Sequence, residues 1–488
     1  MSIMHEIIER RQRRISVEGH SLGVHVPESR RVPVVPFGRS PFVICEIKRR
    51  SPSKGAISAS LDAVAQASLY ASRGIRTVSV LTEEDHFSGS LEDLIRVKES
   101  NPDLCVLRKD FLTDVEDIEL SYRAGADCVL LIASALDRER FELLFRTAGR
   151  LGIACLVEVH SAEEVAMVAG ARPAFTGINA RDLSTFSVDP LLPLSVRRFI
   201  DWDTQTVFES GIQSREHARF AAASGFSGIL VGESVVRDPS LAAELAEGLE
   251  EGKRSAQERG AAPFFWSELA ARRRGGRPLV KVCGLTSPED AHLAERLGAD
   301  VLGFILAPSK RRVDESAVAE VGATGALKVG VVVLGQGASA LPDEAARLLE
   351  TGALDALQFH GDEQPSECSR LAFPYYKALQ LRGSDDAGQV SGFRCPRVLV
   401  DAYSKDARGG TGRSLDASTI AAVQERTPLW LAGGIGPDNV FEIITGFSPE
   451  LIDASSALEA SPGRKDPEKL NRFFAEIERA VAAVTERA

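Results

Sequence analysis

The stretch Phe42-Val-Ile-Cys-Glu-Ile-Lys48, followed by Arg-Arg-Ser-Pro-Ser-Lys-Gly55, decides the fold. A short apolar run ends in a carboxylate and an ammonium group and then breaks into a polar loop. Alternate residues of a strand share a face, so Glu46 and Lys48 project together from the end of a buried strand. Burying unneutralised charges is costly, so this pair indicates chemistry or a ligand at the strand end.

The same kind of apolar run recurs along the chain, separated by helical segments such as Asp62–Arg73 and Ser214–Ser224. Apolar strands that alternate with helices indicate a parallel sheet, and eight such units indicate a closed (β/α)8 barrel. The first half contains eight predicted strands: Val43–Lys48, Thr77–Leu81, Leu104–Arg108, Asp127–Ile132, Ile153–Val159, Phe175–Asn179, Thr206–Ser210 and Gly228–Gly232. The second half again contains eight: Leu279–Cys283, Asp300–Leu306, Leu327–Val333, Asp355–His360, Tyr375–Leu379, Pro396–Ala402, Pro428–Ala432 and Glu450–Ala454.

The sequence therefore predicts an α/β protein of two tandem TIM barrels. A chain of 488 residues is too long for one core and suits two domains. We place the first barrel at residues 1–250, a linker at 251–278 and the second barrel at 279–488. The linker contains the aromatic cluster Phe264-Phe265-Trp266, which we expect to pack at the domain seam. The first 40 or so residues are expected to form an extra helix that caps the first barrel.

Composition narrows the class of protein. The formal net charge of −11 argues against a nucleic-acid surface, and no apolar run is long enough for a membrane span. The seven cysteines are scattered, which predicts reduced thiols in a cytoplasmic protein. The first residues lack the apolar core of a signal peptide. Without a metal-ligand cluster or dinucleotide motif, we predict no metal and no cofactor. An acidic fused chain is compatible with a monomer.

The active site of a (β/α)8 barrel lies at the carboxyl ends of its strands. In the first half, residues at these ends are Glu46, Lys48, Lys109, Glu158, Asn179, Arg181 and Glu209. Any one of these residues alone is explained as a solvated strand end or as part of an ion-pair network. Because the whole set converges on one barrel mouth, we favour a functional site over this structural explanation. Turns after strands seven and eight predict phosphate binding through backbone N–H groups, with Arg50 and Ser51 as added donors. The turn residues are Ser210, Gly211, Gly232 and Glu233.

These residues carry a resemblance. The decapeptide Glu46–Gly55, with Leu107–Phe111, Val157–Val159, Gly177–Leu183 and Glu209–Ile212, resembles indole-3-glycerol-phosphate synthase. That family closes an indole ring on 1-(2-carboxyphenylamino)-1-deoxyribulose 5-phosphate, with loss of CO2 and water. The resemblance implies that Lys109 is the general acid on the ribulose carbonyl. Glu158 and Lys48 would serve later acid/base steps, Glu46 would hold Lys48, and Asn179 and Glu209 would contact substrate.

The second half places Cys283 and Asp401 at strand ends on opposite sides of its mouth. Alone, they read as a small buried residue and as a turn former. Together with Pro308–Val313, Gln358–Glu363, Gly409–Gly412, Leu431–Ile435 and Asp453–Glu459, they resemble phosphoribosylanthranilate isomerase. That family performs an Amadori rearrangement of N-(5-phosphoribosyl)anthranilate.

The resemblance implies that Asp401 is the acid and Cys283 the base. The acid requires a pKa above about 3.9 and the base a pKa below about 8.5. Arg311 would bind the anthranilate carboxylate. His360 is either a further mouth contact or a structural histidine. Gly433, Gly434, Ser455 and Ser456 would bind phosphate, and Gly410 and Gly412 would belong to a flap.

In these families the isomerase product is the synthase substrate, so the two resemblances together imply a bifunctional lyase and isomerase of tryptophan biosynthesis that binds phosphorylated small molecules. One alternative is a single catalytic barrel beside a ligand-binding partner barrel. Another is a sugar-phosphate isomerase of the histidine-pathway type, which uses two aspartates and is disfavoured by Cys283.

Overall fold

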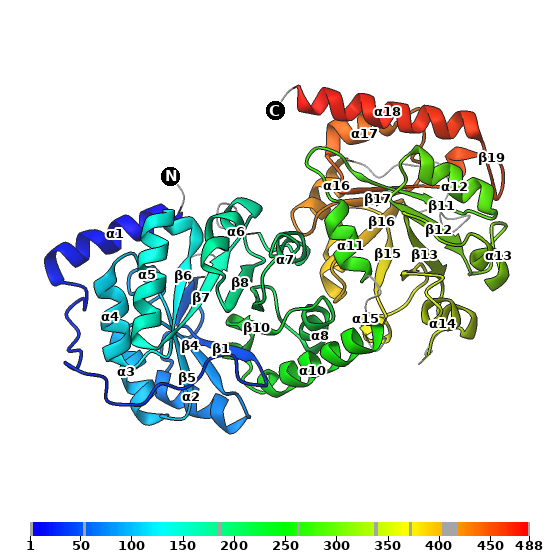
Figure 1. The fold of residues 1–488 in the computed structure, drawn as a ribbon. Helices are drawn as coiled ribbons and strands as arrows, with labels where there is room; N and C mark the ends of the chain where they lie inside the picture. The colour runs from blue at the N-terminus through cyan, green and yellow to red at the C-terminus, as the bar shows by residue number, and fades with distance from the viewer. Residues whose placement is uncertain are drawn as a thin grey trace. The chain divides into compact units, whose positions relative to one another are not determined.

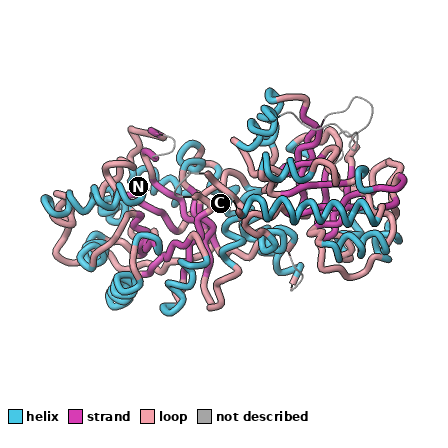
Figure 2. The backbone as a smooth tube through the Cα atoms, turned by 90° about the horizontal axis from the view of Figure 1, so that it is seen from above, coloured by secondary structure: helices cyan, strands magenta, loops and turns pink. Residues whose placement is uncertain are grey.

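The computed structural model describes residues 3–51, 55–182, 187–260, 264–335, 340–369, 373–402 and 417–486. The chain divides into two compact units, residues 1–262 and 263–488. Each contains one closed barrel of eight parallel strands, and in each the strands lie inside a layer of helices (Figures 1 and 2). The predicted class of two (β/α)8 barrels is confirmed. Among the described residues, none of the helices combines the length and apolar character that a membrane crossing requires.

The first barrel closes because β1 pairs with both β4 and β10. Its strands are β1 Val43–Ile47, β4 Thr77–Leu81, β5 Cys105–Lys109, β6 Cys128–Ile132, β7 Ala154–Val159, β8 Phe175–Asn179, β9 Gln205–Glu209 and β10 Gly228–Val231. Its helices are α1 Ile3–Glu18, α2 Ala63–Ser72, α3 Leu91–Ser100, α4 Val115–Ala124, α5 Arg138–Leu151, α6 Ala162–Val168, α7 Leu192–Arg197, α8 Arg215–Ala223, α9 Glu233–Arg237 and α10 Leu241–Arg259. A short hairpin, β2 Arg50–Ser51 and β3 Gly55–Ala56, follows β1.

The second barrel closes through β11, which pairs with β12 and β18. Its strands are β11 Leu279–Cys283, β12 Val301–Ile305, β13 Leu327–Val332, β14 Ala356–Phe359, β15 Tyr375–Leu381, β16 Val398–Ala402, β17 Trp430–Ala432 and β18 Leu451–Ala454. Its helices are α11 Phe265–Arg272, α12 Pro288–Leu297, α13 Glu315–Glu320, α14 Asp343–Glu350, α15 Pro365–Ser369, α16 Ala417–Gln424, α17 Val440–Phe447 and α18 Pro467–Thr485. A hairpin of β19 Glu459–Ser461 and β20 Arg464–Lys465 precedes α18.

The predicted linker of residues 251–278 contains much helical structure. Helix α10 runs to Arg259, and α11 begins at Phe265. The buried rings of Phe265 and Trp266 lie against Tyr376 and Trp430, with ring centroids 6.4 and 6.1 Å apart respectively. The aromatic cluster therefore packs within the second unit, because Tyr376 and Trp430 belong to its barrel strands.

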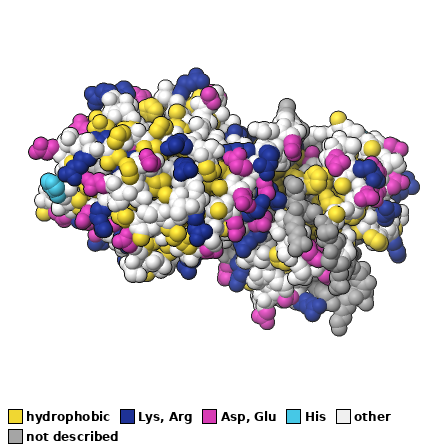
Figure 3. Space-filling model, turned by 90° about the horizontal axis from the view of Figure 1, so that it is seen from below, with side chains coloured by type: hydrophobic (Ala, Val, Ile, Leu, Met, Phe, Trp, Pro, Cys, Tyr) yellow, Lys and Arg dark blue, Asp and Glu magenta, His cyan; other side chains and the backbone are white. Residues whose placement is uncertain are grey.

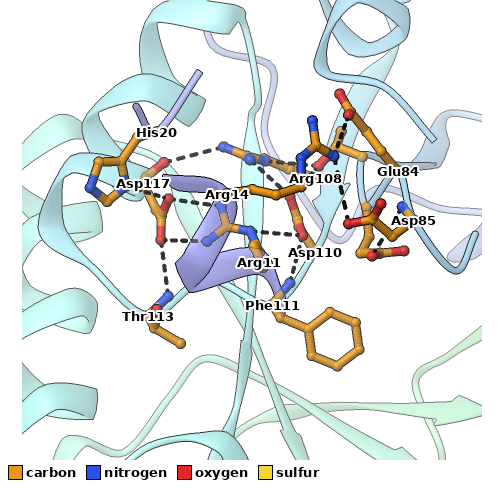
Figure 4. A network of polar contacts seen from close by, with 12 residues as sticks. Arg11, Arg14, His20, Glu84, Asp85, Arg108, Asp110, Phe111, Thr113 and Asp117 are labelled. Atoms are coloured by element: carbon orange, nitrogen blue, oxygen red, sulfur yellow. Dashed lines mark hydrogen bonds and ion pairs between the residues drawn. The ribbon is translucent and has the colours of Figure 1, made fainter. Parts of the chain in front are cut away.

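Helix α1 is the helix predicted before the first strand, and one buried arginine attaches it to the first barrel. Arg11 donates two hydrogen bonds to Asp117, at 2.8 and 3.2 Å, and its Nε lies 3.4 Å from Asp110 (Figure 4). Arg108 binds the other oxygen of Asp110 at 2.8 Å. Asp110 directly follows Lys109, so this network fixes the backbone beside a predicted catalytic lysine.

Candidate active sites

The carboxyl ends of the first barrel's strands bring together the side chains that the sequence predicts there. Glu46 lies on β1, Lys109 ends β5, Glu158 lies on β7, Asn179 ends β8 and Glu209 ends β9. Each of the three carboxylates is buried, with exposed fractions of 4% or less. Parallel strands of a closed barrel all end at the same mouth, so residues 163 positions apart in sequence (46 to 209) share one site.

Lys109 is the centre of this cluster. Its Nζ lies 2.9 Å from Glu158 Oε2 and 3.2 Å from Glu209 Oε2. Burial alone would lower the pKa of Lys109, but the charges of Glu158, Glu209 and Glu46 outweigh burial and raise it. The lysine is therefore an ammonium group, able to donate a proton.

The two carboxylates that share this lysine have different proton affinities. Burial and the neighbouring Glu158 charge raise the pKa of Glu209 to about 8, against the opposing effect of Lys109. The pKa of Glu158 is held well below its usual value, because Lys109 and His160 overcome the effect of burial. Asn179 adds a hydrogen bond to Glu158 at 3.3 Å. Of the two carboxylates, Glu209 therefore holds a proton more tightly than Glu158.

Lys48 and Glu46 form a second ion pair, with Nζ 2.6 Å from Oε1. Gly232, which follows β10, leaves room for this pair. A Cβ atom at Gly232 would lie 2.6 Å from Glu46 Oε1 and 3.0 Å from Lys48 Nζ. Glycine at the predicted phosphate turn therefore also preserves the geometry of the Glu46–Lys48 ion pair.

The predicted phosphate-binding residues occupy loops around the same mouth. Ser210 and Gly211 adopt left-handed backbone angles, with φ of 68° and 79°, directly after β9. Gly232 is the N-cap of the short helix α9, and Glu233 turns its carboxylate to Arg237 at 3.0 Å. Ser51 is buried in the β2–β3 hairpin, whereas Arg50 is exposed. Arg181 lies beyond β8, where its backbone N–H donates to Asn179.

In the second barrel, Cys283 is the last residue of β11 and is buried. Lys281, on the same face, donates to Asp453 at 2.5 Å and to Gln358 at 2.7 Å. The expectation of a lowered thiol pKa is wrong for this structure: burial raises the pKa of Cys283 despite the opposing effects of Lys281 and Lys465.

Asp401 is the last residue but one of β16, and its side chain is buried, with 2% exposure. His360 Nε2 lies 3.4 Å from Asp401 Oδ2, and His360 Nδ1 lies 3.0 Å from Gln358 Nε2. The other oxygen of Asp401 has no hydrogen-bond partner within the part of the chain that the structure describes. Asp401 also raises the pKa of Asp453, after the larger effect of burial. Asp453 thus lies in electrostatic range of both the predicted acid and Cys283.

Arg311 is already paired in the structure. Its Nε lies 2.8 Å from Glu459 Oε1 and its Nη2 lies 2.9 Å from Glu459 Oε2. Glu459 also receives Lys465 at 3.2 Å, and Lys465 donates to the carbonyl oxygen of Cys283 at 2.7 Å. Arg311 is therefore held beside Cys283, with a bidentate geometry that suits a carboxylate.

The predicted phosphate residues of the second barrel follow its last two strands. Gly433 and Gly434 adopt left-handed φ angles of 96° and 65° after β17. Ser455 and Ser456 follow β18, and the carbonyl oxygen of Ser455 accepts from Lys465 at 3.2 Å. The predicted flap residues, Gly410 and Gly412, lie outside the described residues.

Sequence reasoning missed several polar residues of these sites. His160 follows Glu158 by two residues, and Lys281 precedes Cys283 by two, so the alternation of strand faces was a signal for both. Glu459 and Lys465 lie in a hairpin after the last strand, for which the barrel pattern offers no signal.

Comparisons with known proteins match each half of the chain to a protein family. A family model of indole-3-glycerol phosphate synthase matches residues 34–247, and one of N-(5'-phosphoribosyl)anthranilate isomerase matches residues 280–476. A tryptophan biosynthesis protein of Phytophthora nicotianae is 30% identical, over 86% of this chain and 88% of the relative. A multifunctional tryptophan biosynthesis protein of Phycomyces blakesleeanus is 32% identical, over 89% of this chain and 62% of the relative.

Among solved structures, phosphoribosyl anthranilate isomerase from Thermus thermophilus is 33% identical, over 41% of this chain and 98% of that chain, with a TM-score of 0.36. The chain spans 62% and 59% of the lengths of the two multifunctional relatives from Phycomyces blakesleeanus and Schizosaccharomyces pombe. On the matches to both domains, in this order, the chain belongs to the family of tryptophan biosynthesis proteins that join an indole-3-glycerol phosphate synthase domain to an N-(5'-phosphoribosyl)anthranilate isomerase domain.

Proposed function

We propose that the chain catalyses two consecutive reactions on phosphorylated small molecules. The second barrel would isomerise N-(5-phosphoribosyl)anthranilate, and the first would convert the resulting carboxyphenylamino-deoxyribulose phosphate to indole-3-glycerol phosphate. The observation that carries this proposal is the contact of Lys109 with two carboxylates of unequal proton affinity at one barrel mouth. Family membership supports both halves of the proposal.

In the first barrel, ring closure needs an electrophilic carbonyl carbon and a proton for its oxygen. The Lys109 ammonium would donate that proton as the aromatic carbon attacks and would stabilise the developing charge. Loss of CO2 restores the aromatic ring. Dehydration then needs an acid at the departing hydroxyl and a base, roles that suit Lys48 and the ionised Glu158. Glu46 keeps Lys48 in place through their 2.6 Å contact.

In the second barrel, the proposed steps begin with Asp401. Its carboxylic acid would protonate the furanose ring oxygen, and the ring C–O bond would break to give an iminium ion. Cys283 would then remove the C2 proton, leaving an enolamine that tautomerises to the ketone. Arg311 would bind the anthranilate carboxylate and thereby orient the ring. His360, 3.4 Å from Asp401, would help to return the proton to that acid.

A labelling experiment tests this function. The full chain is incubated with N-(5-phosphoribosyl)anthranilate carrying 13C in the carboxylate, and both products are measured. We expect labelled CO2 and unlabelled indole-3-glycerol phosphate in equal amounts. Consumption of substrate without CO2 would leave only the isomerase and would support the alternative of one catalytic barrel. No consumption at all would refute the proposal.

We further propose that the chain is a cytoplasmic monomer. The seven free cysteines support a reducing compartment. Large exposed hydrophobic side chains of the described residues are few and isolated, and charges of both signs intermingle over the face drawn in Figure 3. Sedimentation should give a mass near 52.5 kDa, and twice that value would contradict the proposal.

A further inference from the structure

The imidazole of His160 lies between two carboxylates at the mouth of the first barrel. Its Nε2 forms an ion pair with Glu158 Oε1 at 3.3 Å, and its Nδ1 hydrogen bonds to Glu164 Oε2 at 3.2 Å. Glu164 also accepts the backbone N–H of His160 at 2.8 Å, which fixes this carboxylate at the start of α6. The ring is well buried, with 12% of its side chain exposed.

The surroundings of the ring favour its charged form. Nδ1 of His160 forms a hydrogen bond with Glu164, and Nε2 lies at ion-pair distance from Glu158 without hydrogen-bond geometry, so negative charge approaches the ring from both sides and favours the imidazolium. Burial opposes the charge, yet Glu158 and Glu164 outweigh it and raise the pKa of His160 to about 10. His160 therefore brings a positive charge to Glu158 at neutral pH.

The contacts of the two lysine-bound carboxylates are unequal. Glu158 receives Lys109 at 2.9 Å, His160 at 3.3 Å and Asn179 at 3.3 Å. Glu209 receives Lys109 at 3.2 Å, and its Oε1 has no hydrogen-bond partner among the residues that the structure describes. Without His160, Lys109 would be the cation that both carboxylates contact, at the similar distances of 2.9 and 3.2 Å.

We propose that His160 is a positioning residue that holds Glu158 as a carboxylate and so leaves the proton of the Glu158–Glu209 pair on Glu209. This rests on the proposed synthase function of the first barrel. The charged groups that face the pair are Lys109 from β5 and His160 after β7. Glu46 from β1 acts on Lys109, and Glu164 from α6 acts on His160. Glu158 is then the base of the site, whereas Lys109 and Glu209 are its protonated groups.

The first test reads the charge of the ring without any activity. The full chain, labelled with 13C at the histidine ring, is titrated by NMR, and the His160 signal is identified by its loss in His160→Gln. We expect His160 to stay protonated through pH 8. Glu164→Gln removes one of its two carboxylates and should lower its pKa. A His160 signal that titrates near the ordinary value of about 6.5 would overturn the proposal.

The second test reads the effect on Glu158. Loss of the positive charge raises the pKa of Glu158. In the pH profile of synthase kcat/KM, the fall on the acid side (the acid limb) should therefore move up by about one pH unit in His160→Gln. The kcat should fall more than KM changes. His160→Lys, which keeps a positive charge, should move the limb back toward wild type. Unfolding midpoints of both variants report whether the barrel remains folded.

These outcomes separate the inference from the function. Equal loss of activity in both variants, with the acid limb unmoved, would mean that His160 has only a structural role. If the wild-type chain shows no synthase activity while His160 stays charged through pH 8, the proposed function fails but the charge assignment stands. An unmoved limb in a folded, active His160→Gln would overturn the inference alone.

Discussion

Replacing Gly177 on β8 by alanine should disable the first barrel without unfolding it. An added Cβ would lie 2.0 Å from Glu209 Oε1 and 3.4 Å from Leu156 Cδ1. The carboxylate oxygen would have to retreat by about 1.4 Å, from 2.0 Å to the 3.4 Å of ordinary van der Waals contact. Such a shift displaces the carboxylate whose other oxygen, Oε2, lies 3.2 Å from Lys109 Nζ, and we expect it to weaken that contact.

A misplacement of about 1 Å in a catalytic constellation can cost about 10²-fold in rate, so we expect a loss of that size in synthase kcat/KM. Stability should change little, because the clashing atom is the end of a flexible side chain. Isomerase activity should be unchanged. Gly149→Ala is the matched control: it lies in α5 with nothing within 4 Å of an added Cβ, and should stabilise by about 0.5–1 kcal/mol.

The measurements are steady-state kinetics of both activities and urea unfolding of each variant. Wild-type synthase kinetics in Gly177→Ala would refute the reasoning, because they would show that Glu209 need not stay where it contacts Lys109. A loss of several kcal/mol of unfolding free energy would also refute the reasoning, because it would show that the barrel backbone and not only the Glu209 carboxylate is strained.

Three further predictions follow from other contacts. Arg11→Met removes one buried partner of Asp117 and of Asp110, while His20 and Arg108 keep their contacts with these carboxylates, so the first unit should lose about 3 kcal/mol of unfolding free energy, the lower end for a broken buried pair, measured by urea titration, with isomerase activity retained. The pKa of His160 is raised to about 10 in the folded chain, so its stabilising effect is full below about pH 6.5 and lost as pH rises to about 10. The urea midpoint should fall over that range, less steeply in His160→Gln; equal slopes would contradict it. Burial raises the pKa of Cys283, so alkylation by iodoacetamide should be slow at pH 7, accelerate with pH and abolish isomerase but not synthase activity; fast alkylation at pH 7 would contradict it.

The architecture could be predicted because each strand is a local pattern. All sixteen predicted strands correspond to strands of the two barrels, with ends that differ by a few residues. The predicted helices Asp62–Arg73 and Ser214–Ser224 differ by one residue at each end, since Asp62 and Ser214 are N-caps that accept backbone N–H groups. The strand predicted from Pro396 begins at Val398, in keeping with the missing N–H of proline.

The convergence of the first site also followed from the sequence, because parallel strands must end at one mouth. Proton affinities did not follow, because they depend on burial and on distances between residues of different strands. The pKa of Cys283 is the clearest case: strand alternation could have predicted its neighbour Lys281, but not the hairpin residue Lys465 or the larger effect of burial. The pairing of Arg311 with Glu459 joins residues 148 positions apart, outside any barrel strand pattern.

The central claim is that two separate sites perform consecutive reactions, and a fluorescence time course with N-(5-phosphoribosyl)anthranilate tests it most directly. Wild type, Cys283→Ala and Lys109→Ala are compared, with product identity confirmed by mass spectrometry. The account predicts that wild type forms indole-3-glycerol phosphate, that Cys283→Ala leaves the substrate unconsumed, and that Lys109→Ala accumulates the ribulose intermediate. Loss of both reactions from either single substitution, in a folded protein, would contradict it.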